Sequence, residues 1–204
     1  MTSLAPSVGT LYDGSVMIRL IVFLGNKGLK YSKTRHNVGW QFLADRSDSF
    51  AFANWQEKFH GLWAKGVFAQ SPQYLLKPMT YMNESGRSVS AIAQYFSLEP
   101  AQILIVHDDV ELDFRTIRLQ MGGSLAGHNG LRSISSAIGS KDMFRLRVGV
   151  GRPTHGSVSS HVLGRFDEFE QAELQLVFLA MEQILEAWFK QGCKADGLPI
   201  TRKI

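Results

Sequence analysis

Short apolar runs recur along the chain, and each is bounded by polar, glycine or proline residues. Such runs are typical of buried strands. They predict strands over Ile18–Phe23, Gly61–Phe68, Gln73–Lys77, Ile103–Val106 and Thr116–Met121. A further segment, Phe144–Val150, alternates apolar residues with Arg or Gly, which predicts a strand with one polar face.

Helical spacing of apolar residues separates these strands. Apolar positions three and four residues apart predict amphipathic helices over Val89–Phe96 and Leu174–Trp188. Shorter helices are expected over Leu131–Ile138 and from Val38 onward, with Asn37 as a candidate N-cap. Strands that alternate with helices predict an α/β sandwich built around one sheet.

The length of 204 residues fits one domain, which would bury roughly 70 % of the surface of the unfolded chain. We expect a disordered extension over residues 1–16, a domain over 17–192 and a polar tail over 193–204. No window approaches the ~20 consecutive apolar residues of a membrane span. The single cysteine, Cys193, cannot form an internal disulfide, and residues 1–16 lack the cations of a targeting signal. These features favour a cytoplasmic protein.

The net charge is only +4, but it is unevenly distributed. Residues 115–152 carry seven cations against Asp142 alone, and residues 24–40 carry four cations and no acid. Residues 167–186 carry six acids and no cation. This pattern is compatible with random clustering on a solvated surface, or with a basic face for a polyanion.

Four polar clusters follow predicted strands or begin predicted helices. They are Asn26 with His36-Asn37, Met82-Asn83, His107-Asp108, and His128-Asn129. Because loops of an α/β sheet converge at the carboxyl edge of its parallel strands, these clusters are expected to meet in one site.

Three kinds of site could use these groups. A metal site from His36, His107, His128 and Asp108 is disfavoured, since no two of them have the close spacing of a His-x-x-x-His pair. A nucleophilic triad is unsupported, because no serine lies in a G-x-S-x-G motif and Cys193 lies far from the histidines.

The third kind of site is a His–carboxylate dyad that activates water. Asp108 would accept a hydrogen bond from one ring nitrogen of His36, and the other nitrogen would take a proton from water. Neighbouring asparagines would donate to a carbonyl or oxyanion. From spacing alone a structural role stays open, because an isolated histidine is more often structural than catalytic and turn asparagines often bond to backbone.

At these residues the sequence resembles the bacterial peptidyl-tRNA hydrolase family. Six motifs carry the resemblance, in family order and with family-like gaps: LGNKGLKYSKTRHNVGW, KPMTYMNESGRSV, ILIVHDDVELD, GGSLAGHNGLRSI, FRLRVGVGRP and SSHVLGRF. Together they cover about Ile18 to Phe166. The resemblance implies a single-domain, three-layer α/β sandwich with a mixed, mostly parallel twisted sheet. It also implies hydrolysis of the ester between a peptide and the 3′ ribose of tRNA, without a metal or other cofactor.

The resemblance also implies roles for individual residues. His36 matches the general base, and Asp108 matches its orienting partner. Asn26, Asn83 and Asn129 match asparagines that bind substrate and stabilise the transition state, with Asn26 grouped among the catalytic residues. Pocket-lining positions are matched by Tyr31, Met82 and His128.

Peptidyl-tRNA is the implied partner, bound through its acceptor stem and 3′ CCA end by a monomer. Arg118 and Arg147 match basic positions that hold the acceptor end. The excess of cations adds Arg132 and Lys141 as expected tRNA contacts.

The chain departs from the family pattern at several positions. Lys27 replaces a proline, residues 113–115 replace a Pro-Gly element, Leu125 stands where histidine is frequent, and Gln120 occupies a site that is often basic. Two other functions stay open: a non-catalytic RNA-binding protein of the splicing-factor kind on the same fold, and a small-molecule esterase. The esterase would have no use for the cations of residues 115–152.

Overall fold

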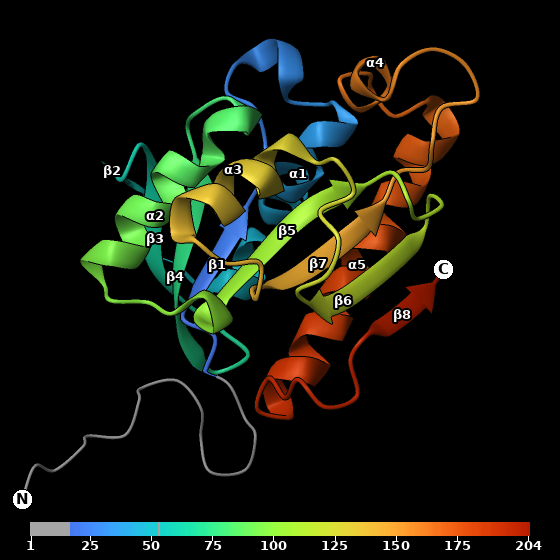
Figure 1. The fold of residues 1–204 in the computed structure, drawn as a ribbon. Helices are drawn as coiled ribbons and strands as arrows, with labels where there is room; N and C mark the ends of the chain where they lie inside the picture. Colours follow the sequence, from blue (N-terminus) through green and yellow to red (C-terminus); the bar gives the residue numbers. More distant parts are fainter. Residues whose placement is uncertain (1–16, 53) are drawn as a thin grey trace, which may run out of the picture.

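The computed structural model describes residues 17–52 and 54–204, so the expected extension over 1–16 lies outside the described residues. Its centre is an eight-stranded sheet with the strand order β2-β3-β4-β1-β5-β7-β6-β8 (Figure 1). The strands are β1 Leu20–Phe23, β2 Gln56–Lys58, β3 Gly61–Phe68, β4 Ser71–Pro78, β5 Ile103–Asp109, β6 Thr116–Met121, β7 Phe144–Gly149 and β8 Ile200–Lys203. The α-helices are α1 Val38–Asp45, α2 Ser85–Tyr95, α3 Asn129–Ile138, α4 Val158–Val162 and α5 Glu168–Lys190.

The sheet is mixed, as expected. Neighbours among the four central strands, β4-β1-β5-β7, are parallel, and the outer pairings are antiparallel. Parallel pairing is therefore confined to the centre, and the expectation of a mostly parallel sheet holds only there. The parallel centre aligns the carboxyl ends of β1 and β5, since Phe23 lies opposite Val106.

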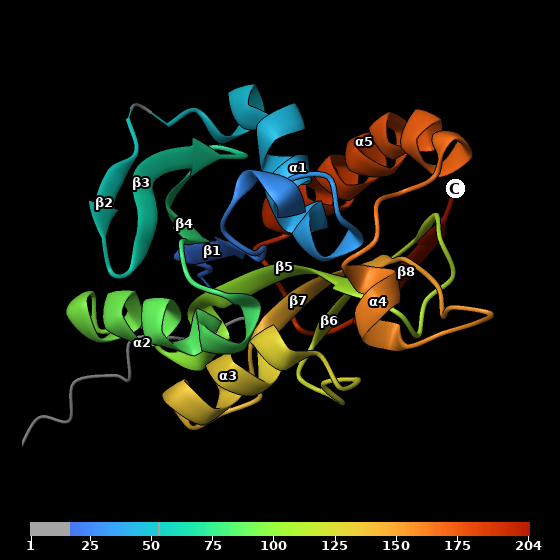
Figure 2. The same cartoon turned by 90° about the horizontal axis from the view of Figure 1, so that it is seen from above.

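Helices cover both faces of the sheet, which gives the expected three layers. Helices α1 and α5 lie on one face, and α2 and α3 lie on the other (Figure 2). Strand β1 shows why: Ile21 and Phe23 pack into the core beneath α1 and α5, whereas Leu20 and Val22 pack into the core beneath α2 and α3. A strand buried on both faces needs the continuous apolar run that the sequence contains. Within the described residues, no helix is long and apolar enough to cross a membrane.

Three features differ from the sequence-based expectations. Strand β7 has no exposed polar face, because Arg145 and Arg147 are both buried. The segment 193–204 is not a free tail: Ile200–Lys203 pairs with β6 as an edge strand, and Cys193 is buried. The short strands β2 and β8 and the short helix α4 were not expected, because mainly exposed edge elements of three to five residues carry little apolar periodicity.

Helix α1 approaches the sheet closely through Gly39. A Cβ atom at this position would lie 2.8 Å from the backbone N and O of Leu24 and 2.8 Å from the backbone O of Val106. The absence of a side chain therefore lets the first turn of α1 rest on the ends of β1 and β5. This contact sets the distance between β5 and the short turn Arg35–Asn37 that precedes the helix.

We predict that Gly39→Ala destabilises the protein. Gly to Ala inside a helix usually stabilises by about 1 kcal/mol, but the collision with three backbone atoms should reverse the sign and cost about 1–3 kcal/mol. Urea unfolding would measure the change. The exposed Ala44→Ser in the same helix is the control and should stay within about 0.5 kcal/mol. A stabilised Gly39→Ala variant would contradict the close packing.

Candidate active site

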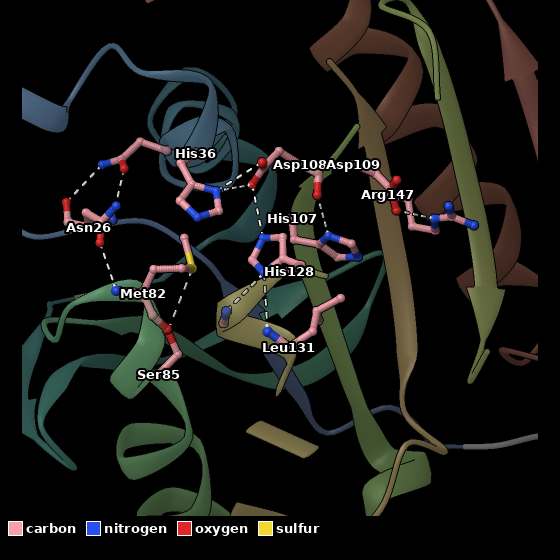
Figure 3. A network of polar contacts seen from close by, with 12 residues as sticks. Asn26, His36, Met82, Ser85, His107, Asp108, Asp109, His128, Leu131 and Arg147 are labelled. Carbon is pink, nitrogen blue, oxygen red and sulfur yellow. Dashed lines mark hydrogen bonds and ion pairs between the residues drawn. The ribbon is translucent and has the colours of Figure 1, made fainter. Parts of the chain in front are cut away.

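The candidate site lies at the carboxyl ends of β1 and β5. The loop after β1 carries Asn26 and His36, and the end of β5 carries His107, Asp108 and Asp109 (Figure 3). The sequence predicts this convergence, and the structure brings the two segments together across 72 positions of the chain.

His36 and Asp108 form a hydrogen-bonded pair. The His36 Nδ1 lies 2.8 Å from Asp108 Oδ1 and 3.0 Å from Oδ2. An ionised carboxylate only accepts, so Nδ1–H is the donor and His36 Nε2 keeps a free lone pair. Burial lowers the pKa of His36, but the charge and the hydrogen bond of Asp108 outweigh burial, so the net shift is upward. This arrangement is that of a general base with an oriented ring.

Asp108 receives a second donor, His128. The His128 Nδ1 accepts from the backbone N–H groups of Gly130 and Leu131, which makes His128 the N-cap of α3. The proton of a neutral ring must then reside on Nε2, which donates to Asp108 Oδ1 at 3.1 Å. Although burial raises the pKa of Asp108, the interactions with His36 and His128 lower it well below its usual range. The sequence indicates His128 as a pocket-lining residue but does not reveal this second bond.

His107 holds the backbone of Asp108 in place through a hydrogen bond. Its Nδ1 donates to the backbone O of Asp108 at 2.6 Å, and the side chain is fully buried. Burial is the largest cause that lowers the pKa of His107 to about 3, so the ring stays neutral. His107 therefore fixes the backbone of Asp108 and does not face the cavity.

Asn26 is held by Asn37 and Met82. The Asn37 side chain accepts from Asn26 N at 2.9 Å and donates to Asn26 O at 3.0 Å. Asn37 thus stands at the N-cap position of α1 without a capping side-chain bond, and its role is to clamp the neighbouring loop. Asn26 Oδ1 accepts from Met82 N at 2.8 Å, which leaves the Asn26 Nδ2 as the group available to a ligand.

A cavity of about 480 Å³ has the His36–Asp108 pair in its wall. Its walls include all the expected catalytic and substrate-binding residues: Asn26, Tyr31, His36, Met82, Asn83, Asp108, His128 and Asn129. Helix α4 and its C-cap residue supply a further wall, which consists of Val158, Ser159, Val162 and Leu163. Apolar periodicity does not reveal α4, and the SSHVLGRF motif is the one signal in the sequence that could have indicated this wall.

The expected tRNA-binding cations have different surroundings. Arg132 and Lys141 are exposed, and Arg118 is partly exposed with its Nε bonded to Thr201 Oγ1 at 2.9 Å. Arg147 differs from the expectation of a surface contact. It is 8 % exposed, and its Nε donates to Asp109 Oδ2 at 2.7 Å. Of the four expected cations, Arg147 is thus the least exposed, and whether each of them contacts tRNA stays a prediction.

One cluster is compact enough to hold a metal ion. The ligand atoms of His36, Asp108 and His128 lie within 4.8 Å of one another. Sequence spacing could not reveal this cluster, because the three groups come from three separate segments. His107, also considered as a ligand, is turned toward backbone instead. The two ring nitrogens that face Asp108 serve as N–H donors to it, so the hydrogen bonds alone account for the cluster.

Comparisons with known proteins find relatives that match most of the chain and a solved structure with a similar fold. The family model described as peptidyl-tRNA hydrolase matches residues 20–201. The peptidyl-tRNA hydrolase of Mycolicibacterium vanbaalenii is 44 % identical over 178 residues, covering 85 % of this chain and 91 % of that protein. That of Lactobacillus delbrueckii subsp. bulgaricus is 40 % identical over 169 residues, covering 83 % and 91 %. The crystal structure of peptidyl-tRNA hydrolase from Acinetobacter baumannii superimposes with a TM-score of 0.77 at 37 % identity, covering 88 % and 95 % of the two chains.

We predict that Asp108→Asn reverses the pKa shift of His36. In the native protein the pKa should lie above 6.5, because Asp108 outweighs burial. With a neutral amide at position 108, burial dominates, so the pKa should fall below 6.5. NMR titration of the histidine ring protons would measure both values. The exposed Asp113→Asn serves as the control and should leave the titration unchanged; a His36 pKa that stays above 6.5 in Asp108→Asn would contradict the pairing.

Proposed function

This chain belongs to the peptidyl-tRNA hydrolase family, and we propose from that premise that it hydrolyses the ester between a peptide and the 3′ ribose of tRNA. The products are free tRNA and free peptide. The observation that carries the proposal is the His36–Asp108 pair at the base of a cavity whose walls include Asn26. Ester hydrolysis needs a positioned water, a base and a donor to the carbonyl oxygen, and these groups supply the last two.

In the proposed reaction, His36 Nε2 takes a proton from water as the water oxygen attacks the ester carbonyl carbon. Asp108 holds the Nδ1–H of His36 and stabilises the imidazolium that forms. Asn26 Nδ2 donates to the developing oxyanion. When the tetrahedral intermediate collapses, the bond to the ribose oxygen breaks, and His36 returns the proton to that oxygen. The peptide leaves with a new carboxyl group.

The other cavity residues are proposed to bind the peptidyl group. The amides of Asn83 and Asn129 can pair with peptide N–H and C=O groups, which a free aminoacyl ester lacks next to its α-carbon. Tyr31 and Met82 give the cavity apolar contact surface, and His128 holds Asp108.

We propose that the 3′ CCA end enters the cavity and that the acceptor stem binds along the surface of α3 and β6. The exposed Arg132 and Lys141 and the partly exposed Arg118 would contact phosphates there. The described residues of one chain supply both the dyad and the cavity walls, which supports action as a monomer. No step of the proposed reaction uses a metal or cofactor. A cytoplasmic setting is proposed because translation supplies the substrate.

We predict that His36→Ala abolishes most turnover, with a loss of at least about 10²-fold in kcat, because general base catalysis contributes this much or more. The assay is release of N-acetyl-amino acid from N-acetyl-aminoacyl-tRNA. The exposed His155→Ala is the control and should retain native activity. Near-native turnover by a folded His36→Ala variant would contradict the proposed base, whereas tRNA binding without any turnover by the native protein would favour the RNA-binding alternative.

We predict that Arg132→Gln and Lys141→Gln each weaken binding of peptidyl-tRNA and flatten its salt dependence. Each lost phosphate contact should reduce the slope of log KM against log salt by about 1. Lys190→Gln, on α5 in the opposite layer, is the control and should leave the slope unchanged. Turnover that is insensitive to salt in the native protein would instead favour a small-molecule esterase.

A further inference from the structure

A buried arginine, Arg145, lies beneath the glycine-rich loop 122–130, and the proposed mechanism makes no use of it. Its side chain is completely buried on the central strand β7. Its Nη1 donates to the backbone O of Ser124 at 2.8 Å, and its Nη2 donates to the backbone O of Gly122. Among the ion pairs between described residues, none involves Arg145. Carbonyl groups of the loop therefore accept from this cation directly, and the nearby charge of Asp109 also favours it.

Gln120 and Arg147 extend this contact toward the active site. Gln120 Nε2 donates to the same Gly122 carbonyl at 2.8 Å, and Gln120 Oε1 accepts from Arg147 Nη1 at 2.5 Å. Arg147 Nε donates to Asp109, the neighbour of Asp108 (Figure 3). A continuous polar network thus joins the end of β5 to the loop.

The loop backbone is shaped to lie on this network. Gly122 and Gly123 have φ angles of +60° and +86°, which glycine adopts without strain. A Cβ atom at Gly123 would lie 2.8 Å from Gln120 Nε2 and 3.2 Å from Arg145 Nη2. The two glycines therefore let the carbonyl of residue 122 face both donors.

The loop in turn places two groups of the site. It leads into α3 through His128, which donates to Asp108, and Asn129, which lines the cavity. A shift of the loop would move the second donor of Asp108 away and displace the Asn129 amide. Misplacing such groups by about 1 Å can reduce a rate by about 10²-fold.

We propose that Arg145, Arg147 and Gln120 are positioning residues, which fix the glycine-rich loop and through it His128 and Asn129. On this view Gln120 acts within the protein, as the link between Arg147 and the loop, and is not a contact to a tRNA phosphate. The inference rests on the proposed function, since it concerns the rate of that reaction.

Gln120→Lys separates the two roles, because they predict opposite effects. Lysine cannot accept a hydrogen bond from Arg147 and places a second cation beside it, so the network should break. We expect kcat to fall by about tenfold to 10²-fold, with little change in KM, on N-acetyl-aminoacyl-tRNA and equally on an N-acetyl-aminoacyl ester of the CCA trinucleotide. A lower KM for the full tRNA with kcat retained would overturn the proposal and indicate a phosphate contact.

A second comparison uses Arg145→Met and Arg145→Lys. Methionine fills the volume without a donor and should lower kcat on both substrates, whereas lysine can donate to a loop carbonyl and should recover part of the loss. Retained kcat in a folded Arg145→Met variant would overturn the proposal. If this variant does not fold, Gln120→Met at a partly exposed position removes the donor to the Gly122 carbonyl and the acceptor for Arg147, so it should lower kcat on both substrates. Retained kcat in Gln120→Met would likewise overturn the proposal.

Lys190→Gln, on α5 in the opposite layer, is the matched control for a cation that faces solvent. It should leave kcat and KM unchanged on both substrates. The native protein reports separately on the proposed function: if it hydrolyses neither substrate, the function is wrong, whereas the positioning role fails only when the native protein is active and the variants match it.

Discussion

One buried carboxylate organises the site. Asp108 is almost inaccessible to solvent, and an isolated charge at such a position would be strongly unfavourable. Two imidazole N–H groups, from His36 and His128, compensate it. Because each ring comes from a different segment, the carboxylate draws together the loop after β1 and the start of α3. Removing the charge would remove one of the attractions that hold both segments at the end of β5.

The strands and helices around Asp108 make this meeting possible. Parallel pairing of β1 with β5 places both strand ends at one edge of the sheet. Gly39 lets α1 rest on these ends, and the clamp between Asn37 and Asn26 fixes the loop between them. The reacting groups thus lie on loops, but each loop is bonded to an element of the rigid centre.

Much of this arrangement could be predicted from the sequence. Continuous apolar runs indicate the central strands because these strands are buried on both faces, and polar residues directly after them indicate the site. Elements with little burial of their own, such as β8 and α4, leave no such pattern. The charge of Arg147 indicates a surface residue, yet Asp109 and Gln120 pair with it inside the protein. Charge counts along a sequence cannot distinguish an exposed cation from one whose partner lies on a neighbouring strand. The second bond to Asp108 was missed because His128 is identified as a donor only through its capping bonds to α3.

Three imidazole rings lie side by side in this site, yet the structure makes them chemically unequal. His128 has both ring nitrogens engaged, one as an acceptor and one as a donor. His107 uses one nitrogen for backbone, and its other nitrogen is buried away from the cavity. Only His36 combines an oriented donor with a lone pair on the cavity side. Among these three rings, only His36 can therefore accept a proton from a water molecule in the cavity. The three side chains are identical, and their hydrogen bonds alone decide which of them can act as the base. The surrounding hydrogen bonds make that choice before substrate arrives.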